Sequence, residues 1–144
     1  MQPKKLIPQI KYLGQTNLND VFIGVFIFSI GILIKVFLAD SFGKYIDPVF
    51  ADLNRYSFDE KIIALLLFSQ QIFLDFNGYS LMAIGIGKTI GINLPENFTA
   101  PYLSTSISDF WRRWHITLSN WIRDYIYIPL GGSKNGVKKQ YFNI

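Results

Sequence analysis

The run VFIGVFIFSIGILIKVFLA, residues 21–39, decides the fold class. It contains one charge, Lys35, near its far end, where a long side chain can reach the lipid headgroups. At about 1.5 Å per residue the run matches a bilayer core about 30 Å thick. The alternative is a buried helix of a soluble protein, but such a helix is seldom apolar on every side over this length. The run therefore predicts a membrane-spanning helix.

The composition of the whole chain agrees with a membrane location. Half of its 144 residues are hydrophobic and 17% are aromatic. The formal net charge is +4, but the basic residues are scattered between apolar runs. This pattern argues against a nucleic-acid partner and favours an anionic membrane surface. The chain contains no cysteine, which excludes disulfides, cysteine-bound metals and thiol nucleophiles. No metal site is predicted.

A second apolar run, residues 62–94, contains polar groups that cannot face lipid. Ser69, Gln70, Gln71 and Asp75 precede its glycine-rich half, which begins at Gly78. The candidates for a polar lining are Gln70, Asp75, Asn77 and Tyr79. Because polar groups and charges are costly in lipid, this run is expected to face a wet cavity or other helices. Gly78 is expected to break the run into two helices, and Gly85 and Gly87 to allow close packing. For Asp75 two interpretations stay open, a place in the cavity lining or simple pairing with a basic residue.

Polar segments lie between and after the apolar runs. Residues 40–61 are mixed in charge, and the pair Asp47-Pro48 predicts a turn there. Near the end of the chain, Pro129 and the glycines that follow it are expected to end a helix. The next residues predict a basic loop of the kind found on the cytoplasmic face, with Lys134, Lys138 and Lys139.

Residues 107–128 predict an amphipathic helix that contains the only histidine of the chain. Ser106 followed three residues later by Asp109 resembles a capping box, so the helix is expected to begin near Ile107. At about 100° per residue, one face is apolar and aromatic, and His115 falls on its border with a polar face. The helix is expected to line a cavity or to lie in the membrane interface. The predicted architecture is all-α, a multi-pass helical membrane protein.

Two interpretations of this helix stay open on the residues alone. In the first, Arg112 and Arg113 bind lipid phosphates and His115 is an ordinary polar residue at the interface. In the second, the imidazole exchanges a proton with a substrate, and the arginines bind an anionic donor or headgroup. Trp111 and Trp114 flank the two arginines and would line the same passage.

The string FWRRWHITLSNWIRDYIYIPLGG, residues 110–132, closely resembles the signature of membrane-bound O-acyltransferases. The similarity is to the bacterial branch that includes the alginate O-acetylation and teichoic acid D-alanyl transfer proteins. QIFLDFNGYSLMAIGIGK and LPENFTAPYLSTSISDFWRRWH follow the same branch in the same order, so the resemblance covers roughly residues 20–133. Asn77 and Thr117 stand where the branch usually has serine. Leu81 replaces its usual aspartate, and no role is assigned there.

The resemblance implies an enzyme that passes an acyl group from a cytoplasmic thioester to a hydroxyl reached through a tunnel. The donor would be acetyl-CoA or an acyl carrier, with no bound cofactor. The expected reaction is O-acetylation of an exported, alginate-like polysaccharide. D-alanyl transfer to teichoic acid is the alternative, and a truncated, non-catalytic membrane protein also stays open. The implied location is the bacterial inner membrane, with lipid, the polysaccharide or a periplasmic or extracellular acetyl-transferring protein as partners.

The resemblance also implies two histidines, of which His115 matches the first. The second, expected to be the main base, would lie in a later apolar segment that this sequence does not include, which leaves His115 a supporting catalytic place. The resemblance therefore implies an internal part of a longer enzyme, inactive by itself. The expected tunnel or donor-binding residues are Gln70, Asp75, Asn77, Tyr79, Trp111, Arg112, Arg113 and Trp114.

Overall fold

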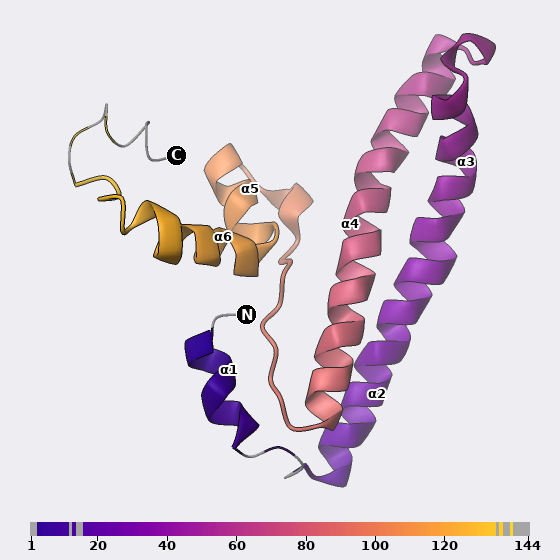
Figure 1. Ribbon diagram of the computed structural model, residues 1–144. Coiled ribbons are helices and arrows are strands. Elements are labelled where there is room, and N and C mark those ends of the chain that lie inside the picture. Colours follow the sequence, from indigo (N-terminus) through magenta and orange to yellow (C-terminus); the bar gives the residue numbers. More distant parts are fainter. Residues whose placement is uncertain (1–2, 12, 14–15, 135, 137–138, 140–144) are drawn as a thin grey trace. The chain divides into compact units, whose positions relative to one another are not determined.

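The computed structural model describes residues 3–11, 13, 16–134, 136 and 139, without the side chains of residues 3–5. Within this part of the chain the regular elements are all helical (Figure 1). The chain forms two compact units, one of residues 11–94 and one that joins Met1–Ile10 to Pro95–Ile144. The predicted all-α class is therefore confirmed for the described residues.

The unit of residues 11–94 is an antiparallel pair of long helices (Figure 1). One continuous helical stretch, Leu18–Ala51, comprises α2 (Leu18–Leu33), the π-helical segment η1 (Ile34–Ala39) and α3 (Asp40–Ala51). A 3-10 turn, η2 (Leu53–Arg55), leads into the second helix, α4 (Phe58–Thr89).

Both long helices have the length and composition of membrane spans. At about 1.5 Å per residue each exceeds a bilayer core about 30 Å thick, so each can cross it with tilt or with projecting ends. Only 11% of the most apolar window of either helix is buried within the chain. The core helix of a soluble protein would be mostly buried, which favours the membrane interpretation.

The prediction of a turn at Asp47-Pro48 is wrong, because both residues lie inside α3. Proline removes one helical hydrogen bond, but α3 gains burial that offsets the loss. Its buried residues recur every three positions, at Gly43, Ile46 and Val49. This spacing places them on one helical face, which packs against α4. The helix therefore continues 12 residues beyond the predicted end at residue 39, and Lys35 lies near its middle rather than at a headgroup.

The prediction that Gly78 divides the second run is also wrong, because α4 is one uninterrupted helix. It begins with a capping box, in which the Ser57 hydroxyl accepts from the Glu60 N–H and the Glu60 carboxylate accepts from the Ser57 N–H. It ends where Gly91, at φ +87°, allows the Ile92 N–H to donate to the Gly87 carbonyl at 2.8 Å.

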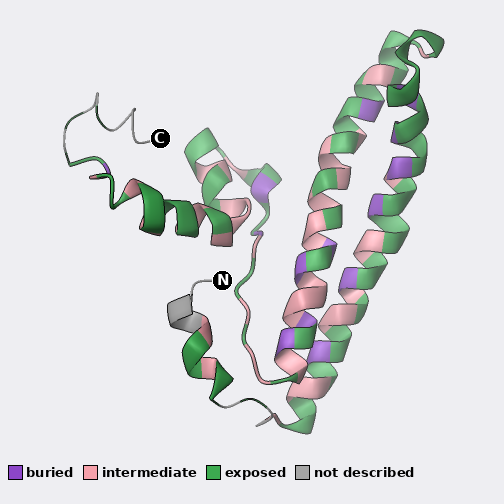
Figure 2. Ribbon diagram, viewed as in Figure 1, coloured by how far each residue is buried: buried purple, intermediate pink, exposed green. Residues whose placement is uncertain are grey.

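Glycines allow the two long helices to touch backbone to backbone. Gly24 packs against Gly85, and Gly31 against Gly78, so a Cβ at any of the four would lie under 3 Å from the facing backbone. Each helix thus presents two glycines seven residues apart, and the buried residues follow the line of contact (Figure 2). The predicted close packing is confirmed for Gly85.

The other unit contains shorter helices. These are α1 (Pro3–Ile10), which the sequence did not predict, the 3-10 turn η3 (Pro101–Leu103), α5 (Ile107–Arg113), α6 (Ile116–Ile122) and the π-helical segment η4 (Arg123–Tyr127). The last helix ends before Pro129, as predicted, and turns follow through Lys134. Lys138 of the predicted basic loop lies outside the described residues.

Candidate functional site

The helix predicted over residues 107–128 is divided at Trp114 and His115. As predicted, α5 begins at Ile107, and the Ser106 hydroxyl accepts from the Asp109 N–H at 3.1 Å. Trp114 is extended, and His115 has φ 42° and ψ 54°, in the left-handed region. The single amphipathic helix of the sequence analysis is therefore wrong. The apolar face that it implied is split between α5 and α6.

A neighbouring loop holds this kink in place. The Asn97 carbonyl accepts from the Ile116 N–H at 2.9 Å, and the Thr99 N–H donates to the Arg113 carbonyl at 3.0 Å. The Thr117 hydroxyl donates to the Asn97 side-chain oxygen at 2.6 Å. Two backbone groups that a continuous helix would use internally, the Arg113 carbonyl and the Ile116 N–H, are thus bonded to a loop 14 and 19 residues earlier in the chain.

We expect Thr117→Val to loosen the kink, because it removes a part-buried hydrogen bond worth about 1 kcal/mol. Amides at residues 116–119 should then exchange with solvent about fivefold faster, as measured by hydrogen exchange on the whole purified protein. Thr117→Ser keeps the hydroxyl and should exchange like the parent. Thr105→Val, at an exposed position, is the matched control. Equal exchange in all variants would contradict the role of this hydrogen bond.

His115 lies at the centre of the kink. A left-handed conformation of a residue other than glycine costs about 1–3 kcal/mol and persists only where surrounding contacts impose it. The histidine is half-buried, and this burial lowers the pKa of its imidazole below the ordinary value of 6.5. The lowered pKa favours the neutral form of the ring. Strained backbone and a neutral imidazole fit the predicted catalytic place of His115, which stays a prediction.

Trp114 belongs to an aromatic cluster beside the kink. Its ring stacks on Phe110 with centroids 5.5 Å apart and meets the edges of Phe98 at 5.1 Å and Tyr102 at 6.4 Å. Phe98 is buried. Trp114 therefore stabilises the fold around His115, whereas Trp111 is more than half exposed.

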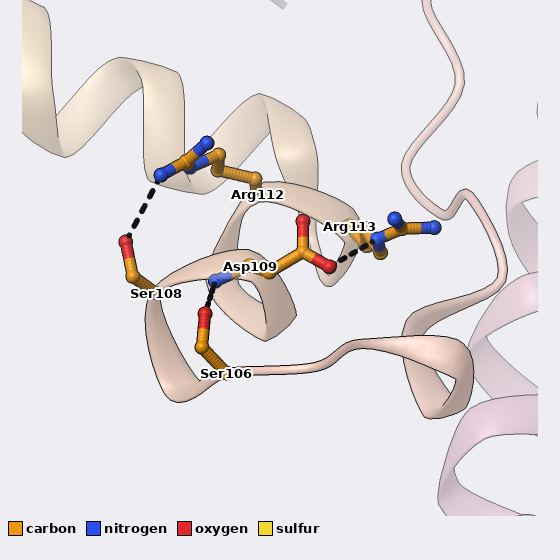
Figure 3. Close-up of polar contacts among 5 residues, drawn as sticks. All are labelled: Ser106, Ser108, Asp109, Arg112 and Arg113. Carbon is orange, nitrogen blue, oxygen red and sulfur yellow. Dashed lines mark hydrogen bonds and ion pairs between the residues drawn. The ribbon is translucent and has the colours of Figure 1, made fainter.

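The two adjacent arginines differ in their contacts (Figure 3). The Arg113 Nε donates to the Asp109 carboxylate at 2.9 Å, and the pair is partly buried. Arg113 therefore takes the structural pairing that the sequence allowed. Arg112 instead donates to the Ser108 hydroxyl at 3.4 Å, and within the described residues no carboxylate forms an ion pair with it. Arg112 retains its positive charge for a ligand.

Arg112 lines a shallow hollow of about 230 Å³ on the surface of α5 and α6. The hollow is lined by Trp111, Arg112, Ile116, Ser119, Asn120 and Arg123. The site prediction included the first two and missed the others. The available signal was the shared helical face of Arg112, Ile116, Asn120 and Arg123, recognised only as the side opposite the apolar face. Among the described residues no cluster of side chains has the composition of a metal site.

The four polar residues predicted from the second run all lie on α4, in the other unit, but not on one side of it. At about 100° per residue, Gln70 and Asn77 share one side and Asp75 and Tyr79 share another. Asp75 forms an ion pair with Lys35. The pairing interpretation of Asp75 is therefore confirmed, and Tyr79 is largely exposed. The four residues therefore do not form one continuous polar lining on α4.

These features define an all-α membrane protein with a pair of apolar helices and a kinked aromatic segment around one histidine. The chain belongs to the membrane-bound O-acyltransferase family, MBOAT, which it matches over residues 7–144.

Three similar proteins illustrate the branches of the family. The chain is 45% identical to the peptidoglycan O-acetyltransferase of Helicobacter pylori, over 90% of this chain and 25% of that protein. It is 47% identical to the probable alginate O-acetylase AlgI of Pseudomonas putida, over 79% of this chain and 23% of that protein. It is 32% identical to the teichoic acid D-alanyltransferase of Bacillus subtilis, over 75% of this chain and 27% of that protein. The chain thus spans about a quarter of the length of these relatives.

Proposed function

We propose that the enzyme containing this chain transfers an acetyl group from a cytoplasmic thioester to a hydroxyl of an exported polysaccharide. The similarity to two kinds of O-acetyltransferase, at 45% and 47% identity, carries the proposal. The D-alanyltransferase relative is less similar, at 32%. Alginate-like chains and peptidoglycan are the two acceptors that these relatives favour. We place the enzyme in the bacterial inner membrane as a multi-pass protein, because this chain, which spans about a quarter of the length of its relatives, already contains two candidate membrane spans.

The proposed reaction needs a group that manages one proton. The acceptor oxygen attacks the thioester carbonyl carbon, the C–O bond forms, and the C–S bond breaks. The hydroxyl proton passes through a histidine to the leaving sulfur. We assign the main base to the family's second histidine, and to His115 a supporting place in which its neutral ring orients or relays the proton. Asn77, Tyr79 and Gln70 remain candidates for the polar lining of the passage.

Acetyl transfer by the whole protein tests this proposal. The protein would be reconstituted in proteoliposomes with radiolabelled acetyl-CoA and offered alginate oligomers, peptidoglycan fragments or lipoteichoic acid, with its periplasmic partner where one is required. Label in either of the first two acceptors is expected. Transfer only from a D-alanyl carrier protein to lipoteichoic acid would establish the alternative reaction, and no transfer from any donor would indicate a non-catalytic membrane protein.

We expect His115→Asn to slow acetyl transfer by the whole enzyme about 10²-fold, the lower end of what a positioned proton-transfer group contributes. Asparagine tolerates the left-handed conformation that His115 adopts, so the kink should survive. His115→Gly, which removes the ring and relieves the strain, should slow the reaction equally. Unchanged transfer in both variants would contradict a catalytic place for His115, and a loss in His115→Ala alone would show that only the backbone conformation matters.

A further inference from the structure

We infer that the hollow between α5 and α6 binds a phosphate group, and that its natural occupant is the headgroup of a membrane phospholipid. The inference goes beyond the proposed acetyl transfer, because it assigns a phospholipid to Arg112 and Trp111, which the resemblance placed only among the tunnel or donor-binding residues. Arg112 and Arg123 both line one hollow of about 230 Å³, together with Ser119 and Asn120.

The charge in the hollow is suited to an anion. No acidic residue lines it. Arg112 donates to a hydroxyl rather than to a carboxylate. Arg123 gives its Nε to the Asp124 carboxylate at 2.9 Å, but a guanidinium has five N–H donors, so its terminal nitrogens can still bind a ligand. Planar guanidinium groups match the oxygens of a phosphate, which they can bind through paired hydrogen bonds.

The apolar side of the hollow indicates a ligand that also has an apolar part. Trp111 is 54% exposed, and Ile116 lies on the α6 face of the hollow. On the opposite side of α6 and η4, Trp121 stacks on Tyr125, with centroids 5.7 Å apart. Tryptophan and tyrosine are typical of the level of the headgroups in membrane proteins. Since the chain belongs to a membrane-bound family, a phospholipid supplies both the phosphate and the apolar part.

A thioester donor such as acetyl-CoA also carries phosphates, so the test must separate the two sources. Whole protein in non-ionic detergent would be titrated with short-chain phosphatidylglycerol and with adenosine 3′,5′-bisphosphate, the phosphate-bearing part of the donor. Dissociation constants would be measured for the parent and for Arg112→Gln and Arg123→Gln. Short-chain diacylglycerol, which lacks the phosphate, controls for apolar binding.

We expect phosphatidylglycerol to bind the parent, and each substitution to weaken that binding about tenfold or more, because each removes a charge-assisted hydrogen bond. Arg112→Lys and Arg123→Lys should weaken phosphatidylglycerol binding less than the glutamine substitutions do, since lysine retains the charge but cannot form the paired hydrogen bonds of a guanidinium. The matched control, Arg55→Gln, removes the same charge from an exposed turn in the other unit and should bind like the parent.

Weaker binding of the adenosine probe alone would assign the hollow to the donor's phosphates and overturn the phospholipid assignment. Equal affinity of parent and variants for both phosphate probes would overturn the phosphate site itself. Melting temperatures of the variants, compared with the parent, separate lost binding from lost folding. Binding is measured without turnover, so failure of this inference is distinguishable from failure of the proposed reaction.

Discussion

Replacing Gly85 with valine is expected to abolish stable accumulation of the whole protein in the membrane. A Cβ at this position would lie 2.6 Å from the Gly24 carbonyl oxygen and 2.6 Å from the Phe28 backbone nitrogen. Both obstacles are backbone atoms, so no side chain can rotate away to make room. Overpacking of a well-packed core costs about 1–3 kcal/mol, and more where the backbone itself must move. The two helices would separate along the glycine contact.

Membrane fractions would be compared by immunoblot, and the surviving detergent-solubilised protein by its melting temperature. Gly31→Val and Gly78→Val meet facing backbone in the same way and should behave like Gly85→Val. Ala51→Val is the matched control, because Ala51 is exposed at the end of α3. Normal accumulation and melting of Gly85→Val would contradict the close approach of α2 and α4.

Reversing one charge at the middle of the helix pair is expected to have the second large effect. Lys35 pairs with Asp75 near the centre of both long helices, and Lys35→Glu would place two carboxylates together there. One unpaired charge at the centre of a membrane helix costs about 2.5–3.5 kcal/mol. We therefore expect the Lys35→Glu protein to be degraded or to melt well below the parent. The exchanged pair, Lys35→Asp with Asp75→Lys, should recover most of the loss.

The ion pair between Asp20 and Lys88, at the ends of the same helices, provides an internal comparison. Its N–O distance is 2.8 Å, and its side chains are 34% and 26% exposed, whereas those of Asp75 and Lys35 are 52% and 39% exposed. Judged by exposure to solvent alone, the ion pair between Lys35 and Asp75 would contribute less to stability than the pair between Asp20 and Lys88. The membrane reverses this order, because central side chains meet lipid or other helices rather than water. Lys88→Glu should lower the free energy of unfolding by about 1 kcal/mol or less. Equal losses of stability in Lys35→Glu and Lys88→Glu would contradict a position of the Lys35–Asp75 pair at the centre of the membrane.

Local patterns predicted much of the fold correctly. The apolar run that begins at Val21 marked a membrane helix, and Ser106 marked the start of α5, because length, hydrophobicity and capping act within a few residues. The same local signals misled at Pro48 and Gly78. A proline and a glycine are read as breaks when only their neighbours are considered. Each lies instead in a helix that is stabilised by packing against another helix.

The candidate site was predicted in part. The sequence identified His115, Arg112 and Trp111, because an isolated histidine among arginines and tryptophans is conspicuous. It did not separate Arg112 from Arg113, whose different roles depend on which side chain reaches Asp109 and which reaches Ser108. Asn120 and Arg123 were missed, since their place in a hollow depends on the way α5 meets α6.

By itself, the sequence determined that this is a helical membrane protein and identified the family signature around His115. Hydrophobicity and residue order are sufficient for both conclusions, because each is a local property of the chain. Only the tertiary structure decided that Lys35 pairs with Asp75 and that the chain bends at His115. The ion pair joins residues 40 positions apart, and the bend is held by hydrogen bonds from the loop that contains Asn97. Such contacts bring distant parts of the chain together, and no periodicity within either segment encodes them.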